Sequence, residues 1–434
     1  MSITAPSTVG DERTAPTTAN ALAAAIMLAL FVLVCLAGSA RKDVTSGFDE
    51  PAHAAYVAHI QHTGNPWPAL EDMRLIDPRT FRFTDEPNYL NHPPIFYDLL
   101  AAIGPTLEGH PDALRADRLF DVGLVALGLA ALLALGLKAN FSWAEFYAYA
   151  MPLLWIPFLV QLAATVNNDD LAFLGGALAT VGLWQTVATG GRVWLGLALV
   201  GVLIAGWAKL TGLLLTATMV IAAFAYLAWR GRLRRGWAIA AGLAFALAAA
   251  PYLIEVWQYG SPTPQTPAQV ALIADGARAA GWADLPRKSF PAYLALFVVA
   301  FIADWMPTLG ARSTFNYAML AIPVAAFACA VAGVACALER LRRRRETTRD
   351  VIAVAGMGAI AVTFAIHVGY SYGRHLATGW LLDAYPRYYL PLAAIVPLAA
   401  LTFAAGITAS RWRGAVLAFL ALGPILVRIF GAPL

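Results

Sequence analysis

Two pairs of neighbouring carboxylates in this 434-residue chain have the clearest chemical potential, and the first is Asp49 with Glu50. Pro51 follows this pair, and proline suits the first turn of a helix. Asp49 is therefore expected near the helix N-cap, where the helix dipole stabilises an anion. His53 lies four residues after Asp49, and Tyr56 lies three residues after His53, so both share a helix face with its start. The pattern suits a carboxylate that accepts a proton, with simple capping of a surface helix as the alternative.

The second pair, Asp169 and Asp170, stands in a short polar connection between two apolar segments. Carboxylates at membrane depth are costly and usually face a polar cavity, although these two could instead cap the next helix. Lys209 is the lone charged residue between Arg192 and Arg230. A lysine in such a place either extends to the membrane interface or binds an anion.

Two further polar segments, 91–97 and 383–391, carry His92 and Arg387. Arg387 is followed by Tyr388. An arginine among tyrosines can anchor a helix in the aromatic belt of the membrane interface, or it can bind a phosphate through two of its nitrogens. Acids and bases arranged in this way suit an anionic lipid phosphate and a hydroxyl that must be deprotonated.

The elements that must position these residues are apolar helices. Hydrophobic residues make up 60% of the chain and charged residues 13%, against about 25% charged in a soluble domain, so lipid must be the solvent for most of the surface. The three cysteines lie in apolar stretches without metal-ligand spacing, so we interpret them as small hydrophobic residues. The chain is thus expected to be an all-α membrane protein of about eleven transmembrane helices, at 21–40, 119–137, 147–166, 171–189, 193–208, 211–229, 237–257, 317–338, 351–369, 389–409 and 414–430.

The first segment, 21–40, could alternatively be a secretory signal, but acidic residues precede it and its length suffices to span. The connections alternate in charge, and the basic set is Lys138, Arg192, four arginines in 230–235, six in 340–349, and Arg411 with Arg413. The acidic set is Asp49, Glu50, Glu71, Asp72, Asp77, Asp85, Glu86, Asp169, Asp170, Asp275, Asp284 and Asp383. The positive-inside rule then places the N-terminus in the cytoplasm and the acidic connections outside.

This topology predicts a disordered cytoplasmic segment at 1–20 and a single transmembrane domain at 21–434. Two long outside loops are expected: 41–118, made of short juxtamembrane helices, and 258–316. The apolar stretch 290–302 is interpreted as an interfacial or re-entrant helix, because a further crossing would place the arginines of 340–345 outside.

With these motifs in this order, the chain resembles the GT-C superfamily of glycosyltransferases that use lipid-linked sugars. Within that superfamily it resembles the bacterial relatives of the protein O-mannosyltransferases and the lipid A aminoarabinose transferase. The matching positions are Asp49-Glu50 with His53 and Tyr56, the segment 92–97, Asp169, Lys209 with Thr211 and Gly212, and the segment 387–391. Two departures stand out: His92 replaces a lysine before the Pro-Pro pair, and the doubled Asp169-Asp170 leaves open which aspartate is functional.

The resemblance implies a GT-C-like helix bundle in the bacterial inner membrane. It implies an inverting transfer of a sugar from a polyprenyl-phosphate donor to a hydroxyl of a glycan, lipid or protein, on the periplasmic face. The implied catalytic residues are Asp49 as general base, Glu50 and Asp169; the implied substrate-binding residues are His53, Tyr56, His92, Asp170, Lys209, Arg387 and Tyr388. Some relatives need a divalent cation and others do not, so the resemblance leaves a metal cofactor open. Asp49, Glu50 and Asp169 could hold Mg²⁺, Mn²⁺ or Ca²⁺.

The competing interpretation is a transporter or flippase of an anionic lipid or lipid-linked sugar, which would also need intramembrane charges. Transporters usually show inverted repeats, and none is visible here; a non-catalytic scaffolding relative is the third option. Nothing in the sequence suggests a nucleic-acid partner or a nucleotide-sugar site.

Overall fold

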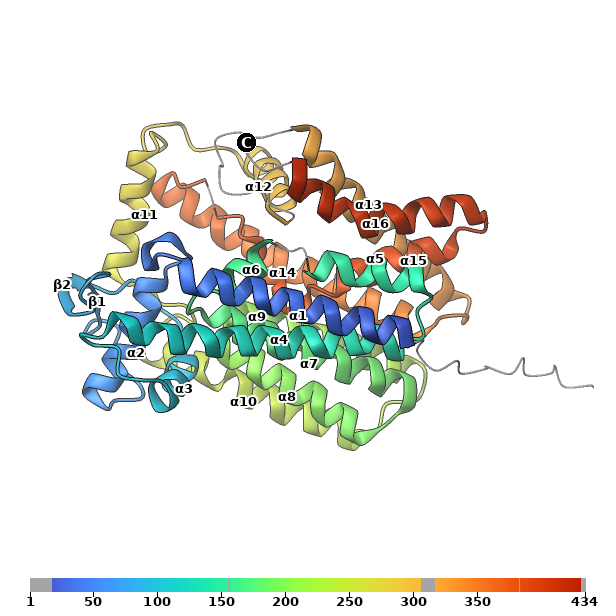
Figure 1. The fold of residues 1–434 in the computed structure, drawn as a ribbon, viewed down its shortest axis with the longest axis horizontal. Coiled ribbons are helices and arrows are strands. Elements are labelled where there is room, and N and C mark those ends of the chain that lie inside the picture. Colours follow the sequence, from blue (N-terminus) through green and yellow to red (C-terminus); the bar gives the residue numbers. More distant parts are fainter. Residues whose placement is uncertain (1–17, 155–156, 306–316, 382, 431–434) are drawn as a thin grey trace, which may run out of the picture.

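The computed structural model describes residues 18–154, 157–305, 317–381 and 383–430, which form a bundle of long, roughly parallel and antiparallel helices (Figure 1). The described residues contain sixteen α-helices: α1 (Thr18–Arg41), α2 (Glu50–Thr63), α3 (Ile95–Ile103), α4 (Leu114–Lys138), α5 (Trp143–Leu154), α6 (Pro157–Ala163), α7 (Asn168–Thr189), α8 (Arg192–Ala208), α9 (Leu210–Trp229), α10 (Arg235–Tyr259), α11 (Pro267–Ala279), α12 (Phe290–Trp305), α13 (Tyr317–Arg342), α14 (Thr348–Thr378), α15 (Ile395–Gly406) and α16 (Ser410–Phe430). Two strands and three 3₁₀ turns complete them: β1 (Arg74–Ile76), β2 (Phe83–Pro87), η1 (Val44–Ser46), η2 (Pro111–Ala113) and η3 (Pro386–Leu392).

The chain is a polytopic helical membrane protein. Within the described residues, eight helices are long and apolar enough to cross a bilayer, and nine if η3 and α15, bent by 66°, form one span. The predicted count of about eleven is not confirmed. Of the third expected span, the structure describes α5 and α6 on either side of residues 155–156, and α8 has only 17 residues.

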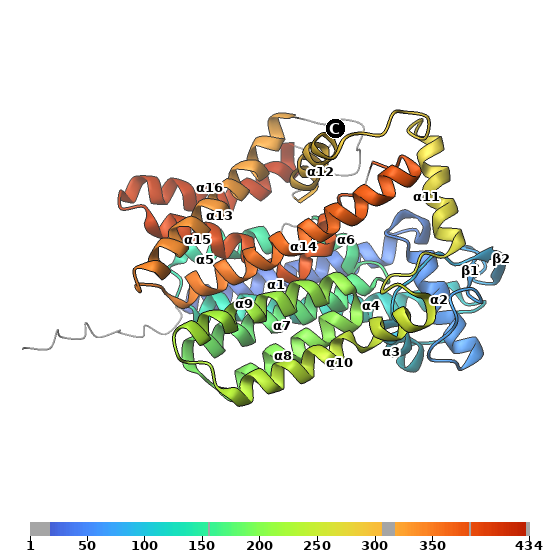
Figure 2. The same cartoon turned by 180° about the vertical axis from the view of Figure 1, so that it is seen from behind.

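Two groups of residues gather within the bundle. Figures 1 and 2 show α2, α3, both strands and α11 gathered at one end. At another site, Glu145 pairs with Arg349 at 3.5 Å and Arg413 at 3.0 Å, and Arg230 pairs with Glu346 at 2.9 Å. These ion pairs bring the basic connections together, as their common predicted side requires. Which end faces the cytoplasm remains a prediction of the positive-inside rule.

The first predicted loop, 41–118, contains the short helices α2 and α3 and also an unexpected antiparallel pair of strands, β1 and β2. The strands are three and five residues long, too short for a clear alternation of polar and apolar residues. In the second loop, the expected apolar helix is α12, which appears nearly end-on among helices that lie in the plane of the view (Figure 2). Most of the predicted N-terminal disordered segment, and the part of the second loop at 306–316, lie outside the described residues.

Small residues let α7 approach its neighbours closely. A Cβ added at Gly175 or Gly182 would collide with the backbone of α8, and one at Gly176 would collide with the Pro391 carbonyl in η3. Close packing of this kind is a common way of joining helices in lipid. It fixes the start of α7, which carries Asp169, relative to η3, which carries Arg387.

Candidate active site

A cavity of about 420 Å³ lies where the first loop, α11, α14, η3 and the junction of α8 with α9 meet. Its volume falls in the usual range for small-molecule sites. Most of the predicted site residues line this cavity: Asp49, His53, His92, Asp169, Lys209, Arg387 and Tyr388. The structure thus brings together residues that are more than 300 positions apart in the sequence.

The charged side chains of the cavity form an alternating row of acids and bases. Lys209 Nζ lies 2.7 Å from Asp169 Oδ1, and Arg387 Nε lies 3.8 Å from the other oxygen of this carboxylate. Arg387 also donates from a terminal nitrogen to Asp49 Oδ2 at 3.4 Å. The Lys209 ammonium stands 4.0 Å from the centre of the Tyr388 ring, a cation–π geometry. Two cations are therefore held side by side at one end of the cavity.

Lys209 points inward because the chain changes direction at this residue. It ends α8 and precedes α9 with an extended backbone, φ −162° and ψ 143°. Its side chain is 10% exposed and is bonded to Asp169. This geometry does not agree with a lysine that extends to the membrane interface.

Asp49 occupies the N-cap position of α2, as the sequence predicts, but its side chain does not cap the helix. Phe48 and Asp49 both have positive φ, 32° and 64°, which is uncommon for non-glycine residues and typical of strained functional sites. In this conformation the carboxylate accepts a hydrogen bond from the Tyr89 hydroxyl at 3.1 Å. It remains 42% exposed, so it is accessible to a ligand in the cavity.

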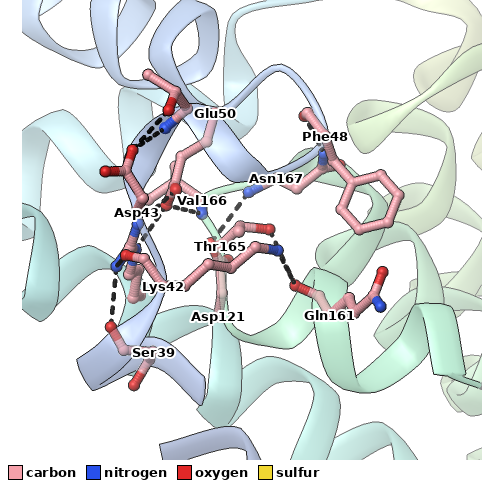
Figure 3. A network of polar contacts seen from close by, with 12 residues as sticks. Ser39, Lys42, Asp43, Phe48, Glu50, Asp121, Gln161, Thr165, Val166 and Asn167 are labelled. Carbon is pink, nitrogen blue, oxygen red and sulfur yellow. Dashed lines mark hydrogen bonds and ion pairs between the residues drawn. The ribbon is translucent and has the colours of Figure 1, made fainter. Parts of the chain in front are cut away.

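Glu50 points away from the cavity and into a buried polar network (Figure 3). It accepts hydrogen bonds from Arg118 Nε at 2.7 Å and from a terminal nitrogen of Arg118 at 2.6 Å, and from the Val166 backbone at 2.9 Å. Arg118 also donates to the Ser39 and Lys42 carbonyls, both at 2.9 Å. The pair thus ties α1, α2, α4 and the turn before α7 together. Burial raises the pKa of Glu50, and the Arg118 guanidinium opposes that shift.

This placement does not agree with the catalytic role expected for Glu50, since the cavity lining does not include it. Neighbouring residues at the helix start diverge because Asp49 adopts the left-handed conformation. Sequence reasoning also missed Arg118. The sequence feature that could have identified it is an arginine near the start of a largely apolar helix, with Asp117 and Asp121 close by.

His53 is held neutral by its hydrogen bonds. The Asn167 side-chain oxygen accepts from the Asp169 backbone at 2.9 Å, so its amide nitrogen faces His53 Nε2 at 3.3 Å. That ring nitrogen must be the acceptor, which leaves Nδ1 to donate to the Tyr97 hydroxyl at 2.9 Å. Burial, followed by the nearby cations of the cavity, lowers the pKa of His53 well below 6.5. A neutral imidazole therefore lines the site at neutral pH.

His92 and Tyr56 differ in position. His92 lines the cavity, and burial, with the positive charge of Lys209, lowers its pKa well below 6.5. Tyr56 is buried behind the wall, donates to the His92 carbonyl at 3.2 Å and stacks on Tyr97 at 4.0 Å between ring centres. Tyr56 thus supports the wall of the site rather than its surface.

The two aspartates at the start of α7 also separate. Asp169 lines the cavity, whereas Asp170 is buried outside the lining and neither of its oxygens has a hydrogen-bond partner among the described residues. The sequence left the choice between them open, and the structure places Asp169 beside Lys209.

The three carboxylates considered for a divalent cation do not converge. Arg387 lies between Asp49 and Asp169, and Arg118 occupies both oxygens of Glu50. In the described part of the chain, no group of three or more His, Cys, Asp or Glu side chains is arranged to hold a metal. These residues therefore do not fit a shared cation.

The far side of the cavity contains residues that were not predicted. Arg374 in α14 pairs with both oxygens of Asp383, at 3.1 and 3.3 Å, and His367 and Tyr370 lie on the same helix face. The available signal was their spacing near the end of α14, three or four residues apart. From the sequence, Asp383 was assigned only to the acidic set of the outside connections.

Comparisons with known proteins give a single kind of match. No family model matches the chain, and no curated protein matches it. Among solved structures, ArnT from Cupriavidus metallidurans bound to undecaprenyl phosphate is similar at 14% identity over 92% of this chain and 77% of that one, with a TM-score of 0.38. The apo state of ArnT is similar at 14% identity over 94% and 78%, with a TM-score of 0.35. The function proposed below is argued from the cavity of this chain.

Proposed function

We propose that this protein is an inverting glycosyltransferase that moves a sugar from a polyprenyl-phosphate donor to a hydroxyl acceptor. The observation that carries this proposal is the arrangement of Lys209, Arg387 and Asp49 around one cavity at the loop end of a membrane bundle. Two cations suit a phosphate, and an accessible carboxylate beside them suits the removal of a proton. A donor carried by lipid can reach such a cavity from the bilayer.

Charge balance explains how the donor would enter. Lys209 and Arg387 are matched by Asp169 and Asp49, so the row has no net charge. Asp169 is buried and bonded to Lys209, whereas Asp49 is half-exposed and contacts Arg387 at 3.4 Å. The donor phosphate therefore replaces Asp49 on Arg387, and this exchange releases the Asp49 carboxylate to act as a base.

The chemical step follows from these positions. The acceptor oxygen attacks the anomeric carbon, and the bond from that carbon to the phosphate oxygen breaks with its electron pair moving to the phosphate. Lys209 and Arg387 stabilise the departing phosphate, an effect worth several kcal/mol when the cations are preorganised. Asp49 takes the acceptor proton, which contributes typically ~10²–10⁴-fold. Attack opposite the leaving group inverts the configuration of the anomeric carbon.

The other residues hold this arrangement. Asp169 orients both cations, Tyr388 lies under Lys209, and neutral His53 and His92 form the wall nearest the first loop. We assign Glu50 with Arg118, and Tyr56, to positioning. The proposal also includes the finer predictions: about eleven crossings, a cytoplasmic N-terminus, the bacterial inner membrane, and a glycan, lipid or protein acceptor on the outer side.

The test uses purified protein in liposomes with polyprenyl phosphate carrying a labelled hexose or pentose, and a cell-envelope extract as the source of acceptors. We expect the wild type to convert the donor to free polyprenyl phosphate and labelled product, measured by mass spectrometry, and Lys209→Met to do so far more slowly. Lipid that crosses the bilayer with its sugar intact would instead support a flippase.

A further inference from the structure

The far end of the cavity is a second polar site, built around Arg374. The guanidinium is held by both oxygens of Asp383 and donates to the Tyr370 hydroxyl at 3.0 Å. Tyr370 in turn accepts from Gln265, at 2.9 Å, in the connection that leads to α11. Arg374, Asp383 and Tyr370 all line the cavity. This cluster is therefore a built part of the wall rather than a surface ion pair.

The two charges of this second site are paired with each other and buried, in contrast to the row at Lys209, where Asp49 is accessible. Asp383 is 2% exposed and faces Arg374 with both oxygens, so it cannot turn to solvent as the half-exposed Asp49 can. An anion that binds here would be repelled by the Asp383 carboxylate, which cannot move away from Arg374. The site is therefore suited to a neutral ligand.

Polar groups without partners show what kind of neutral ligand is needed. Arg374 and Thr363 line the cavity, and Arg374 Nε and Thr363 Oγ1 are buried without a hydrogen-bond partner among the described residues. A buried donor left unpaired costs about 1–3 kcal/mol, so a ligand that supplies oxygen acceptors is favoured. Asp383 in turn accepts hydrogen bonds. Several hydroxyls on one small ring would match this mixture of donors and acceptors.

Tyr388 connects the two ends of the cavity. Its ring lies 4.0 Å from Lys209 Nζ and 5.5 Å, centre to centre, from the ring of His367, which stands about two helical turns before Arg374. A group bonded to a phosphate at Lys209 would thus lie along Tyr388 and reach toward Arg374. The flat tyrosine ring offers an apolar surface to the C–H face of such a group.

We propose that the end formed by Arg374, Asp383 and Thr363 is the subsite for the sugar ring of the donor. The inference rests on the proposed function, because it takes the phosphate to bind at Lys209 and Arg387. One sugar hydroxyl accepts from Arg374 Nε, and another donates to Asp383. The subsite therefore governs recognition of the sugar and not of the lipid phosphate.

The experiment compares two probes in nanodiscs: polyprenyl phosphate without a sugar, and the same lipid phosphate carrying a hexose. The test variant combines Arg374→Gln with Asp383→Asn, so that neither charge is left buried alone. The matched control is Arg115→Gln, an exposed arginine at the start of α4. Binding is measured by the quenching of tryptophan fluorescence, after gel filtration has shown that each variant is folded.

We expect the wild type and the control to prefer the hexose-bearing probe by about tenfold or more, as charge-assisted hydrogen bonds allow. The double variant should bind the bare lipid phosphate within about twofold of the wild type and lose most of the preference. Thr363→Val, a smaller change that keeps the fold if the double variant does not, should lower the preference by a few fold. An unchanged preference in these variants, or equal loss of both probes, would overturn the sugar subsite. A wild type that binds neither probe would instead refute the proposed function.

Discussion

The pair formed by Glu50 and Arg118 holds the turn that carries Asp49. The substitution Glu50→Gln therefore distinguishes a structural role of Glu50 from a catalytic one. Glutamine preserves the volume and one acceptor oxygen of Glu50. Its amide nitrogen, however, faces a terminal nitrogen of Arg118, where the wild type has a hydrogen bond of 2.6 Å. The guanidinium, whose side chain is only 6% exposed, then lacks its counter-charge.

The expected cost follows from this burial. Breaking a buried ion pair by removing one partner costs about 3–5 kcal/mol. Arg118 keeps its bonds to the Ser39 and Lys42 carbonyls, so we expect the lower part of that range, about 3 kcal/mol. The matched control is Glu339→Gln, which breaks exposed pairs with Arg342 and Arg343 and should cost at most about 1 kcal/mol.

The assay is denaturant unfolding in detergent, followed by tryptophan fluorescence, with donor turnover measured on the folded protein. Glu50→Gln should lower the free energy of unfolding well beyond the control. The folded variant should still turn over donor, at a reduced rate, because the Asp49 carboxylate itself is present. Wild-type stability together with complete loss of turnover would refute this reasoning and restore the catalytic role that the sequence suggested for Glu50.

Three other outcomes are expected. Lys209→Met should weaken donor binding by on the order of 1.5–3 kcal/mol. The control Lys138→Met changes the last residue of α4, outside the cavity lining, and should leave donor binding unchanged. Equal affinities of the two variants in titration calorimetry would contradict the phosphate site. Because burial lowers the pKa of His53 below 6.5, the unfolded chain binds a proton that the folded chain does not, and the free energy of unfolding falls as the pH drops below about 6.5. His53→Gln should remove about 1 kcal/mol of that fall between pH 6.5 and 5.5, and free energies of unfolding with an unchanged pH dependence would count against a buried neutral imidazole. In a cysteine-free background, a cysteine at Thr45 should react with an impermeant reagent on intact cells and one at Arg343 should not, and labelling of the second would reverse the topology.

Much of the bundle could be predicted because a bilayer imposes a length and an apolar composition on each crossing. The exact number of crossings is harder to predict, because a segment such as α8, with 17 residues, lies at the lower limit of the length that a crossing needs. The hairpin of β1 and β2 could not be predicted, since strands of three and five residues leave little pattern.

The charged row was foreseeable because isolated charges in apolar sequence are rare and functional. The sequence could not predict the direction in which each charged side chain points. Asp49 and Glu50 are adjacent, yet a positive φ at Asp49 sends one carboxylate to the cavity and the other to Arg118. Arg374 was missed because its importance depends on Asp383, nine residues away across the end of a helix.

The most direct test of the account is the rate of sugar transfer by Asp49→Asn. Asparagine preserves the size of the side chain but removes its basicity. Asp43→Asn is the control, since Asp43 is an exposed aspartate in the same connection that caps Thr45. With a purified polyprenyl-phosphate donor, we expect Asp49→Asn to lower turnover by about 10² or more while donor affinity is largely kept, and Asp43→Asn to act like the wild type. Full turnover by Asp49→Asn would contradict the general-base role on which the proposed mechanism depends.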